Sequence, residues 1–256
     1  MQNFLITGSK GLLGHKVCEN LVKNGKTVYA LTTNSKNLKI DKVIYKNFDF
    51  SKNWTTKDLP NNLDVIIHLA QSNKFRNFPD DTFEVFKVNI ESTLLLLNYA
   101  KDIGVKKFIY ASSGGIYGNG PHPFKETDEI STPEKLGTYL GGKAYCEALV
   151  NSFNGIFQTI ILRPFFVYGS GQNRDMLIPR IFDNIQKQKP IKIDGEEGIF
   201  LNPIHVNDAS EAILASLKTH ENSTFNIGGP DILSIKKISE AMGLYIGKTP
   251  IFNKTN

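Results

Sequence analysis

Hydrophobic and polar residues alternate along the chain in blocks that predict strands and helices in turn. Short apolar runs such as "DVIIHLA" are typical of strands that are buried on both faces of a sheet. Longer segments, in which apolar residues recur at helical spacing, separate several of these runs. We predict strands at residues 4–7, 27–31, 42–50, 64–70, 106–113 and 158–169, and helices at 12–24, 82–103 and 138–153.

The order of these elements indicates an α/β fold. Regular alternation of strands and helices is typical of right-handed βαβ units on a doubly wound parallel sheet. In such sheets ligands bind at the carboxyl ends of the strands. The residues that follow the predicted strands are therefore the candidates for a binding site.

Composition and charge exclude several classes of protein. The 256 residues are 40% hydrophobic and 21% charged, as in ordinary globular proteins, and the formal net charge is +5. The lysines are scattered and form no dense basic run, so we predict no binding of nucleic acid. The sequence contains no pattern of a signal peptide or membrane span, and Cys18 and Cys146 lack metal-ligand spacing. We expect a cytoplasmic protein with free thiols and no metal centre.

Three glycines follow the first predicted strand, in the stretch "TGSKGLLG". Gly8, Gly11 and Gly14 occupy every third position and lead into the first predicted helix. Without a Cβ the backbone can approach a pyrophosphate, and the helix N-terminus supplies unpaired N–H groups and a positive dipole end. A tight turn that needs glycine for packing alone is the alternative. The strand–turn–helix context favours a phosphate site.

The end of the second predicted strand bears on which dinucleotide would bind. Proteins that prefer NAD usually carry Asp or Glu there, which holds the ribose 2′-hydroxyl. Here the strand continues into Thr32, Thr33 and, further on, Lys36, with no acid among them. Lys10, inside the glycine turn, adds a mobile positive charge. These residues favour the 2′-phosphate of NADP over NAD, although both lysines are equally compatible with an ordinary lysine-rich surface.

A serine, a tyrosine and a lysine form a candidate catalytic group. Ser113 ends a predicted strand, while Tyr139 and Lys143 lie four residues apart at the start of a predicted helix, on one face. An ammonium beside a phenol favours the phenolate and lowers its pKa, which makes Tyr139 a plausible general acid/base. The serine hydroxyl can hold the carbonyl or hydroxyl that reacts. A Tyr-x-x-x-Lys pattern alone arises by chance in many helices, so the combination with the glycine turn carries the prediction.

These segments together resemble the extended short-chain dehydrogenase/reductases, in particular the NAD-dependent epimerase/dehydratase family. The resemblance covers nearly the whole chain and rests on "TGSKGLLG", "DVIIHLA", "VNIESTLLLLNYA", "YASSGGIYG", "YLGGK", "LRPFFVYGSGQ", "HVNDASEAI" and "FNIGG". It implies that Ser113, Tyr139 and Lys143 are catalytic and that Lys143 also holds the nicotinamide ribose. It further implies a cofactor site in which Asp49 and Phe50 flank the adenine, together with Gly8, Gly11, Leu12, Leu13, Gly14, Leu69, Ala70, Tyr139, Lys143 and Pro164. The residues considered above for the 2′-phosphate add Lys10, Thr32, Thr33 and Lys36 to this site.

The resemblance also implies an architecture and a partner. We expect a Rossmann-type domain at residues 1–168, with 203–228 returning to it, and a small C-terminal substrate lobe formed by residues 169–202 and 229–256. In this family the two long helices pair across a two-fold axis, so we expect a homodimer. The short C-terminal part suggests an open site or a small substrate.

Departures from the family pattern narrow the activity. Sugar-nucleotide dehydratases of this kind carry an Asp-Glu pair after the catalytic serine or threonine, and here Gly114 and Gly115 stand there, so we predict no dehydratase activity. Phe166 and Leu201 replace an asparagine and an arginine that often bind a nucleoside diphosphate. That leaves a nucleotide-sugar substrate open, with nearby arginines as candidates for the diphosphate at Arg174 and Arg180.

Two classes of function remain. The first is an NAD(P)-dependent epimerase or keto-reductase that transfers a hydride at a sugar carbon, on a nucleotide sugar of a surface-polysaccharide pathway. The second is a non-catalytic NADP-binding sensor or scaffold, and such proteins typically lose the tyrosine or lysine that this chain keeps. Of the histidines, we assign structural roles to His68 and His205, while His122 lies in a proline-rich loop that leaves its role open.

Overall fold

A computed structural model describes residues 2–34, 40–120 and 122–255. The chain divides into two compact units. The first contains residues 1–164 and 208–227, and the second contains residues 165–207 and 228–256. Lys36, expected near the cofactor, lies outside the described residues.

A seven-stranded sheet forms the centre of the first unit, and every neighbouring pair of its strands is parallel. This confirms the predicted α/β class. From one edge to the other, the strands are β11 (Ser223–Ile227), β6 (Gln158–Pro164), β5 (Lys107–Ala111), β4 (Val65–His68), β1 (Asn3–Thr7), β2 (Thr27–Thr32) and β3 (Val43–Asn47). The strand order reverses between β4 and β1, and ligands of doubly wound sheets bind at such a reversal.

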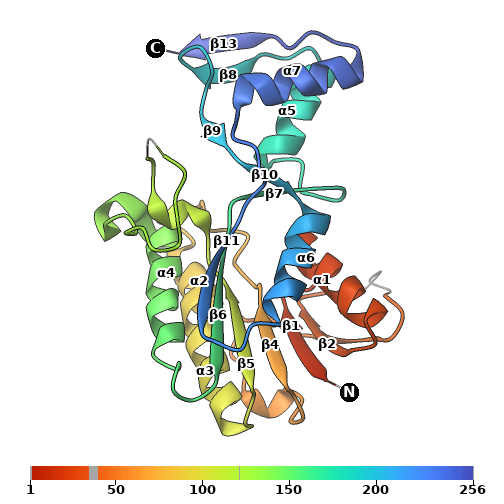
Figure 1. Ribbon diagram of the computed structural model, residues 1–256, viewed down its shortest axis with the longest axis vertical. Coiled ribbons are helices and arrows are strands. Elements are labelled where there is room, and N and C mark those ends of the chain that lie inside the picture. The colour runs from red at the N-terminus through yellow and green to blue at the C-terminus, as the bar shows by residue number, and fades with distance from the viewer. Residues whose placement is uncertain (1, 35–39, 121, 256) are drawn as a thin grey trace. The chain divides into compact units, whose positions relative to one another are not determined.

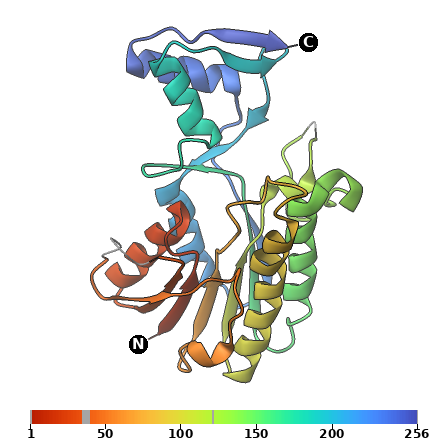
Figure 2. The same cartoon turned by 180° about the vertical axis from the view of Figure 1, so that it is seen from behind.

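Helices cover both faces of this sheet, as Figure 1 and Figure 2 show. One face carries α2 (Thr82–Phe86), the π-helix η2 (Lys87–Glu91), α3 (Ser92–Asp102) and α4 (Pro133–Asn151). The other carries α1 (Leu12–Lys23) and α6 (Val206–Ser216), joined by a hydrogen bond from Asn20 to Ser210. Two 3₁₀ turns complete this part of the chain, η1 (Thr56–Asp58) and η3 (Gly114–Tyr117).

One hydrophobic core of the first unit lies between the sheet and the α2–α4 layer. Leu5, Ile66 and Phe108 project from three adjacent strands onto Leu96 and Cys146 of the helices, and all five are fully buried. Each large apolar side chain buried in this way contributes about 1.5–3 kcal/mol. The near-continuous apolar pattern of β4 follows from its central place, because helices cover both of its faces.

Two local features differ from the sequence-based elements. The helix predicted at 82–103 contains the π-turn η2. By contrast, the helix predicted at 138–153 begins directly after Gly137, where a φ of +62° interrupts α4. The strand predicted at 158–169 is two strands, β6 in the first unit and β7 (Phe166–Tyr168) in the second. A hydrophobic pattern does not record the π-turn or the break between β6 and β7, since apolar residues continue through both segments.

Small sheets and two helices form the second unit. Its strands pair as β7 with β10 (Pro203–His205), β9 (Phe200–Leu201) with β12 (Leu233–Ser234), and β8 (Ile191–Asp194) with β13 (Phe252–Thr255). Helices α5 (Leu177–Gln186) and α7 (Ile235–Ile246) pack on them around a core of Ile181, Ile185, Ile191, Ile193, Leu201, Ile235 and Ile238.

Candidate active site

The glycine turn after β1 needs glycine for two separate reasons. Gly8 has a φ of +66°, and a Cβ on it would lie 2.8 Å from the amide nitrogen of Ala70. A Cβ on Gly14 would lie 2.3 Å from the carbonyl oxygen of Gly8, so the glycine lets α1 approach the turn closely. The amide of Gly11 donates to that same carbonyl at 2.9 Å. The turn thus brings the expected residues Gly8, Gly14 and Ala70 together.

The N-terminus of α1 is suited to an anion. Gly11 is the N-cap and offers no side-chain cap, and the first turn, which begins with Leu12 and Leu13, contains no acid. The first N–H groups of a helix have no partner within it, and they add to the positive end of the dipole. This arrangement fits the pyrophosphate of a dinucleotide.

A buried hydrogen-bond network joins this turn to the end of β4. The hydroxyl of Thr7 accepts from the amides of Leu69 and Ala70 at 3.1 and 3.0 Å, and it lies 2.7 Å from Nδ1 of His68. On the other side of the ring, Nε2 of His68 lies 3.1 Å from the hydroxyl of Thr93. Burial, helped by the charge of Lys143, lowers the pKa of His68 to about 3, so the ring is neutral.

The tautomer of His68 follows from its neighbours. Thr93 donates its own proton to the carbonyl of Asn89 at 2.7 Å, so its oxygen must accept from Nε2–H of His68. Nδ1 is then the acceptor for the Thr7 hydroxyl. His68 therefore has the structural role expected from the sequence, and that role connects two segments of the expected cofactor site.

Residues expected around the adenosine half of the cofactor are placed at the ends of β2 and β3. Thr32 is buried, whereas Thr33 and Lys10 are exposed. Asp49 accepts from the backbone and the hydroxyl of Ser51 at 3.0 and 2.7 Å, which stabilises the turn that follows β3. Burial works to raise the pKa of Asp49, but the two bonds from Ser51 and the charge of Lys52 hold it below its usual value.

Phe50 is a core residue. Its ring packs edge-on against Phe48 and Trp54, with centroids 5.2 Å apart in both pairs, and its side chain is 5% exposed. Because the ring is buried in the core, Phe50 can contact a ligand only through its backbone. Pro164 ends β6 and is half-buried.

The three expected catalytic residues come from β5 and α4. Lys143 is buried and its Nζ donates to the carbonyl of Ala111, the last residue of β5, at 2.7 Å. The same Nζ lies 5.0 Å above the ring of Tyr110. Ser113 is the N-cap of η3, and its hydroxyl accepts from the amide of Gly115 at 3.1 Å. The last carbonyl of β5 thus positions the lysine, and an amide of η3 positions the serine hydroxyl.

The environment of Tyr139 differs from the expectation. Its hydroxyl donates to Oε1 of Gln71 at 2.9 Å, and its ring packs on Phe75 with centroids 4.5 Å apart. Burial raises the pKa of Tyr139 to about 12, and the opposing charge comes from Arg76. The prediction that Lys143 lowers this pKa is therefore wrong for the arrangement described here, because Lys143 is held at Ala111 and burial dominates.

Several site residues were missed by sequence reasoning. Gln71 and Phe75, in the loop after β4, contact Tyr139, and Tyr110 lies under Lys143. Asn89 lies in the π-helix η2. Its backbone carbonyl accepts from the thiol of Cys146 as well as from Thr93, and its side-chain oxygen accepts from the amide of Ser72. π-turns often mark functional sites. Gln71 had one sequence signal, its place directly after the predicted buried strand.

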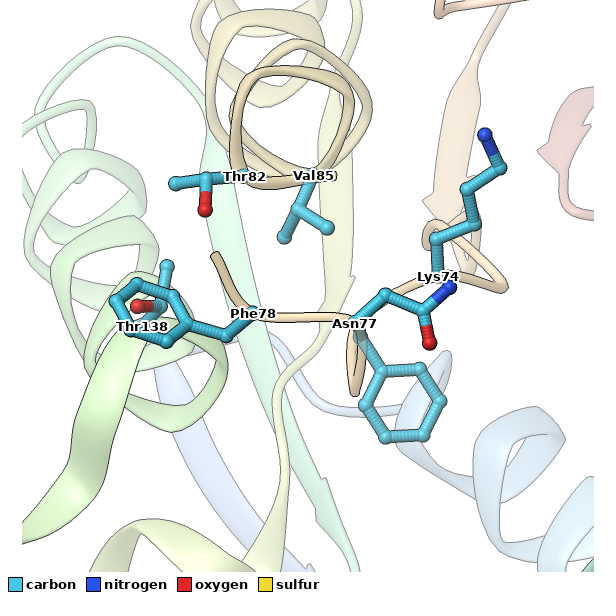
Figure 3. A pocket seen from close by; sticks show the side chains of 7 residues that line it. Lys74, Asn77, Phe78, Thr82, Val85 and Thr138 are labelled. Atoms are coloured by element: carbon cyan, nitrogen blue, oxygen red, sulfur yellow. The ribbon is translucent and has the colours of Figure 1, made fainter. Parts of the chain in front are cut away.

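A small pocket lies beside this site. It is bounded by the loop after β4, the start of α2 and the residue before Tyr139 (Figure 3). Its walls are formed by Lys74, Phe75, Asn77, Phe78, Thr82, Val85 and Thr138. None of the expected catalytic or cofactor residues among the described ones lines it. The loop itself is held by ion pairs from Lys74 to Asp81 and Glu84 at 3.0 and 2.8 Å.

A family model for the NAD dependent epimerase/dehydratase family matches residues 4–228. The chain belongs to this family. It is 31% identical to a UDP-glucuronate 4-epimerase of Thermodesulfobacterium geofontis, over 97% of this chain and 82% of that protein. It is 32% identical to an uncharacterized UDP-glucose epimerase, YtcB, of Bacillus subtilis, over 91% of this chain and 79% of that protein.

A solved structure gives the same picture of the fold. The UDP-glucuronic acid 4-epimerase of Bacillus cereus, in complex with UDP-glucuronic acid and NAD, is 26% identical to this chain. The TM-score is 0.88, over 100% of this chain and 86% of that one. The protein thus belongs to the NAD dependent epimerase/dehydratase family, and a solved structure that resembles it contains NAD and a UDP-sugar.

The positions that depart from the family pattern are visible in the structure. Gly114 and Gly115 both lie in η3, directly after Ser113. In the second unit, Leu201 is buried and Phe166 is 38% exposed.

Basic and histidine side chains that the sequence singled out are placed as follows. Arg174 forms an ion pair with Asp183, while Arg180 is exposed. His205 accepts from the amide of Asn207 at 3.3 Å and packs on Tyr168, a structural role, and His122 is exposed.

The described part of the chain offers neither a metal centre nor a membrane span. No cluster of three or more His, Cys, Asp or Glu side chains could hold a metal ion there. Across the same residues, no helix combines the length and the apolar character needed to cross a membrane.

Proposed function

We propose that this protein is an NAD(P)-dependent enzyme that transfers a hydride at a sugar carbon of a nucleotide sugar, as an epimerase or a keto-reductase. The observation that carries the proposal is the placement of Lys143. Lys143 lies one turn of α4 after Tyr139, and its Nζ donates to the carbonyl of Ala111. Ala111 in turn lies two residues before Ser113 in the chain. The glycine turn supports it, because its open backbone and uncapped helix N-terminus suit a pyrophosphate.

Each residue has a distinct part in the proposed reaction. The bound nicotinamide dinucleotide supplies the hydride acceptor or donor. Ser113 holds the reacting oxygen of the sugar, and the phenol oxygen of Tyr139 exchanges the proton with it. For Tyr139 to act near neutral pH, its pKa must fall from about 12, and the cation that already lowers it in the structure is Arg76. Lys143 also holds the nicotinamide ribose.

Epimerase and keto-reductase differ in the fate of the cofactor. An epimerase must keep its dinucleotide and regenerate it, whereas a reductase exchanges it. The similarity to UDP-glucuronate 4-epimerases supports the first. The absence of an acid at the end of β2, where Thr32 and Thr33 stand, supports a reductase that uses NADP. We propose no dehydratase activity, because Gly114 and Gly115 offer no side chain for proton transfer.

The pathway, compartment and assembly are part of the same proposal. We propose a substrate from a surface-polysaccharide pathway and a cytoplasmic location, which the free buried thiols of Cys18 and Cys146 support. We propose a homodimer through α2, α3 and α4, where Phe83 and Tyr145 are 72% and 56% exposed. A monomer mass in solution scattering would refute the dimer.

Mass spectrometry of the natively purified protein tests the proposed function. Tightly held NAD, together with interconversion of two sugar epimers, supports an epimerase. A protein that arrives without dinucleotide but binds NADPH and reduces a keto-sugar nucleotide supports a reductase. Binding of NADPH with no turnover of any nucleotide sugar supports instead the non-catalytic sensor.

A further inference from the structure

Gln71 binds the hydroxyl of Tyr139, the group that exchanges a proton with the sugar in the proposed function. The hydroxyl donates to Oε1 of Gln71 at 2.9 Å. Gln71 lies on the loop after β4, and Tyr139 lies on α4, 68 residues further along the chain. Because Gln71 is exposed and Tyr139 is half-buried, this bond is at the surface, where a substrate can reach it.

The backbone is fixed on both sides of Gln71. The amide of Ala70 donates to the hydroxyl of Thr7 at 3.0 Å, and the amide of Ser72, which is buried, donates to Oδ1 of Asn89 at 2.8 Å. The side chain of Gln71 therefore starts from a well-anchored backbone. Such support favours a defined role for its amide over that of a mobile surface side chain.

The bond to Gln71 stabilises the protonated form of Tyr139. A hydrogen bond that the phenol donates exists only while the phenol keeps its proton, so this bond opposes ionisation. It acts in the same direction as burial, which raises the pKa of Tyr139 to about 12. An amide oxygen does not remove the proton, and Gln71 therefore holds it on Tyr139.

The charged groups of the loop and of α2 leave this effect in place. Arg76 opposes it, because its positive charge lowers the pKa of Tyr139, but burial outweighs that charge. Lys74, on the same loop, is paired with Asp81 and Glu84 at 3.0 and 2.8 Å.

The ionisable groups of β5 and α4 have other partners or stay neutral. Lys143 is held at the carbonyl of Ala111, and burial raises the pKa of Tyr110 well above its usual value. Burial also raises the pKa of Cys146, and Glu147 is bound in its ion pair with β6. Gln71 is thus the hydrogen-bond partner of the phenol, and Arg76 is the charge that opposes it.

We infer that Gln71 is a further catalytic residue, which keeps Tyr139 in the proton-donating form that the reduction of a sugar ketone requires. This assignment rests on the proposed function, in which Tyr139 exchanges a proton with the sugar oxygen. In the reduction, the sugar carbonyl gains a hydride from the reduced nicotinamide at its carbon and the proton of Tyr139 at its oxygen. An alcohol, an oxidised nicotinamide and a phenolate result. Water then returns a proton to the phenolate, and Gln71 accepts its hydrogen bond again.

The reverse step has the opposite requirement. To take a proton from a sugar alcohol, Tyr139 must first lose its own, against both burial and the bond to Gln71. The fall in pKa noted above is needed for this direction, whereas the phenol already carries the proton that a ketone takes up. Reduction should therefore decline at high pH, and oxidation should rise with pH.

The ionisation of Tyr139 tests the role of Gln71 without any substrate. Difluorotyrosine replaces all 9 tyrosines, because its fluorines lower the pKa of each phenol and report its charge by ¹⁹F NMR. The signal of residue 139 is the one that Tyr139→Phe lacks. We expect Gln71→Ala to lower the pKa of this phenol by about 0.5–1 pH units. Gln71→Glu, which supplies an anionic acceptor, should raise it by about 1 pH unit or more.

Asn73→Ala is the matched control for these variants. Asn73 is exposed on the same loop, and its replacement should leave the pKa of residue 139 unchanged. An unchanged or raised pKa in Gln71→Ala overturns the inference, and so does a lowered pKa in Gln71→Glu.

Kinetics of the same fluorinated proteins connect this pKa to the reaction. The ketone is UDP-4-keto-6-deoxyglucose, with NADPH or NADH, and the alcohols are UDP-glucose and UDP-glucuronate, with NADP or NAD. We expect kcat/KM to fall with pH for the ketone and to rise for the alcohols, with a midpoint that moves in each Gln71 variant as the NMR value does. A midpoint that stays in place while the NMR value moves overturns the catalytic role of Gln71. Turnover of none of these compounds by the unaltered protein refutes the proposed function instead, whatever the NMR titration shows.

Discussion

Thr7 and His68, the last residues of β1 and β4, are register partners at the reversal of strand order, and Oγ1 of Thr7 lies 2.7 Å from Nδ1 of His68. Through this pair the glycine turn and the Leu69–Ala70 segment are held by one hydroxyl. The geometry of the proposed cofactor site therefore depends on a histidine that would not touch the cofactor.

The first prediction concerns the pH dependence of stability. The pKa of His68 falls from 6.5 to about 3 on folding, so the folded protein binds fewer protons than the unfolded chain between these values. The free energy of unfolding is therefore highest above pH 6.5. It decreases as the pH falls toward 3, by up to about 1.4 kcal/mol per pH unit. Urea unfolding at pH 5 and pH 7 measures it.

His68→Phe is the matched variant for this prediction. This substitution removes the titrating group and the ring nitrogens that bond the hydroxyls of Thr7 and Thr93. Each lost hydrogen bond should lower the free energy of unfolding by about 1–3 kcal/mol. We expect lower stability at pH 7 and a smaller loss between pH 7 and pH 5 than in the unaltered protein. An identical pH dependence in both proteins would show that His68 does not titrate in this way.

The second prediction concerns the phenol of Tyr139. Tyr139→Phe keeps the ring contact with Phe75 and removes the proton-transferring hydroxyl, so turnover should fall by about 10²- to 10⁴-fold. The dissociation constant of the dinucleotide should change little. Tyr145→Phe on the same helix, where the side chain is 56% exposed, is the control and should remain active. Retained turnover in Tyr139→Phe would remove this residue from the mechanism.

Two glycine-to-alanine changes are expected to have opposite effects on stability. In Gly14→Ala the new Cβ would lie 2.3 Å from the backbone oxygen of Gly8, which cannot move independently of the turn, so we expect a loss of about 1–3 kcal/mol or more. Gly141 is inside α4, where a Cβ would meet nothing within 4 Å, and Gly141→Ala should stabilise by about 0.5–1 kcal/mol. Thermal unfolding of both variants checks the signs, and a destabilised Gly141→Ala would contradict the second.

The sequence predicted the sheet well because its central strands are buried on both faces and so read as unbroken apolar runs. It also predicted which segments follow those strands, and hence the glycine turn and Ser113. It missed the π-turn at Asn89, because hydrophobic spacing continues through it, whereas the helix predicted at 138–153 begins directly after the break at Gly137. Gln71 and Phe75 were missed for another reason, since their contacts with Tyr139 join residues more than 60 positions apart.

The fourth prediction concerns an ion pair between α4 and β6. Arg163 bonds both carboxylate oxygens of Glu147, at 3.1 and 2.7 Å, and both side chains are less than 10% exposed. Glu147→Leu leaves a buried guanidinium without its partner, so the free energy of unfolding should fall by about 3–5 kcal/mol. Glu19→Gln, which breaks the partly exposed pair with Lys16, should change it by less than about 1 kcal/mol. Similar urea midpoints for both variants would contradict the assignment.

The last prediction tests the choice of dinucleotide. Lys10 is exposed in the glycine turn, next to Gly11 at the N-terminus of α1, and no acid stands among the described residues at the end of β2. If Lys10 meets the 2′-phosphate of NADP, Lys10→Glu replaces an attraction with a repulsion, and the ratio of NADPH to NADH affinity should fall by about 10-fold or more. Lys23→Glu, in the last turn of the same helix, changes the net charge equally but lies at the opposite end, so it should leave the ratio unchanged. Equal ratios in the two variants would assign Lys10 to the solvated surface, and the preference would then have to come from Thr32 and Thr33 or from Lys36, outside the described residues.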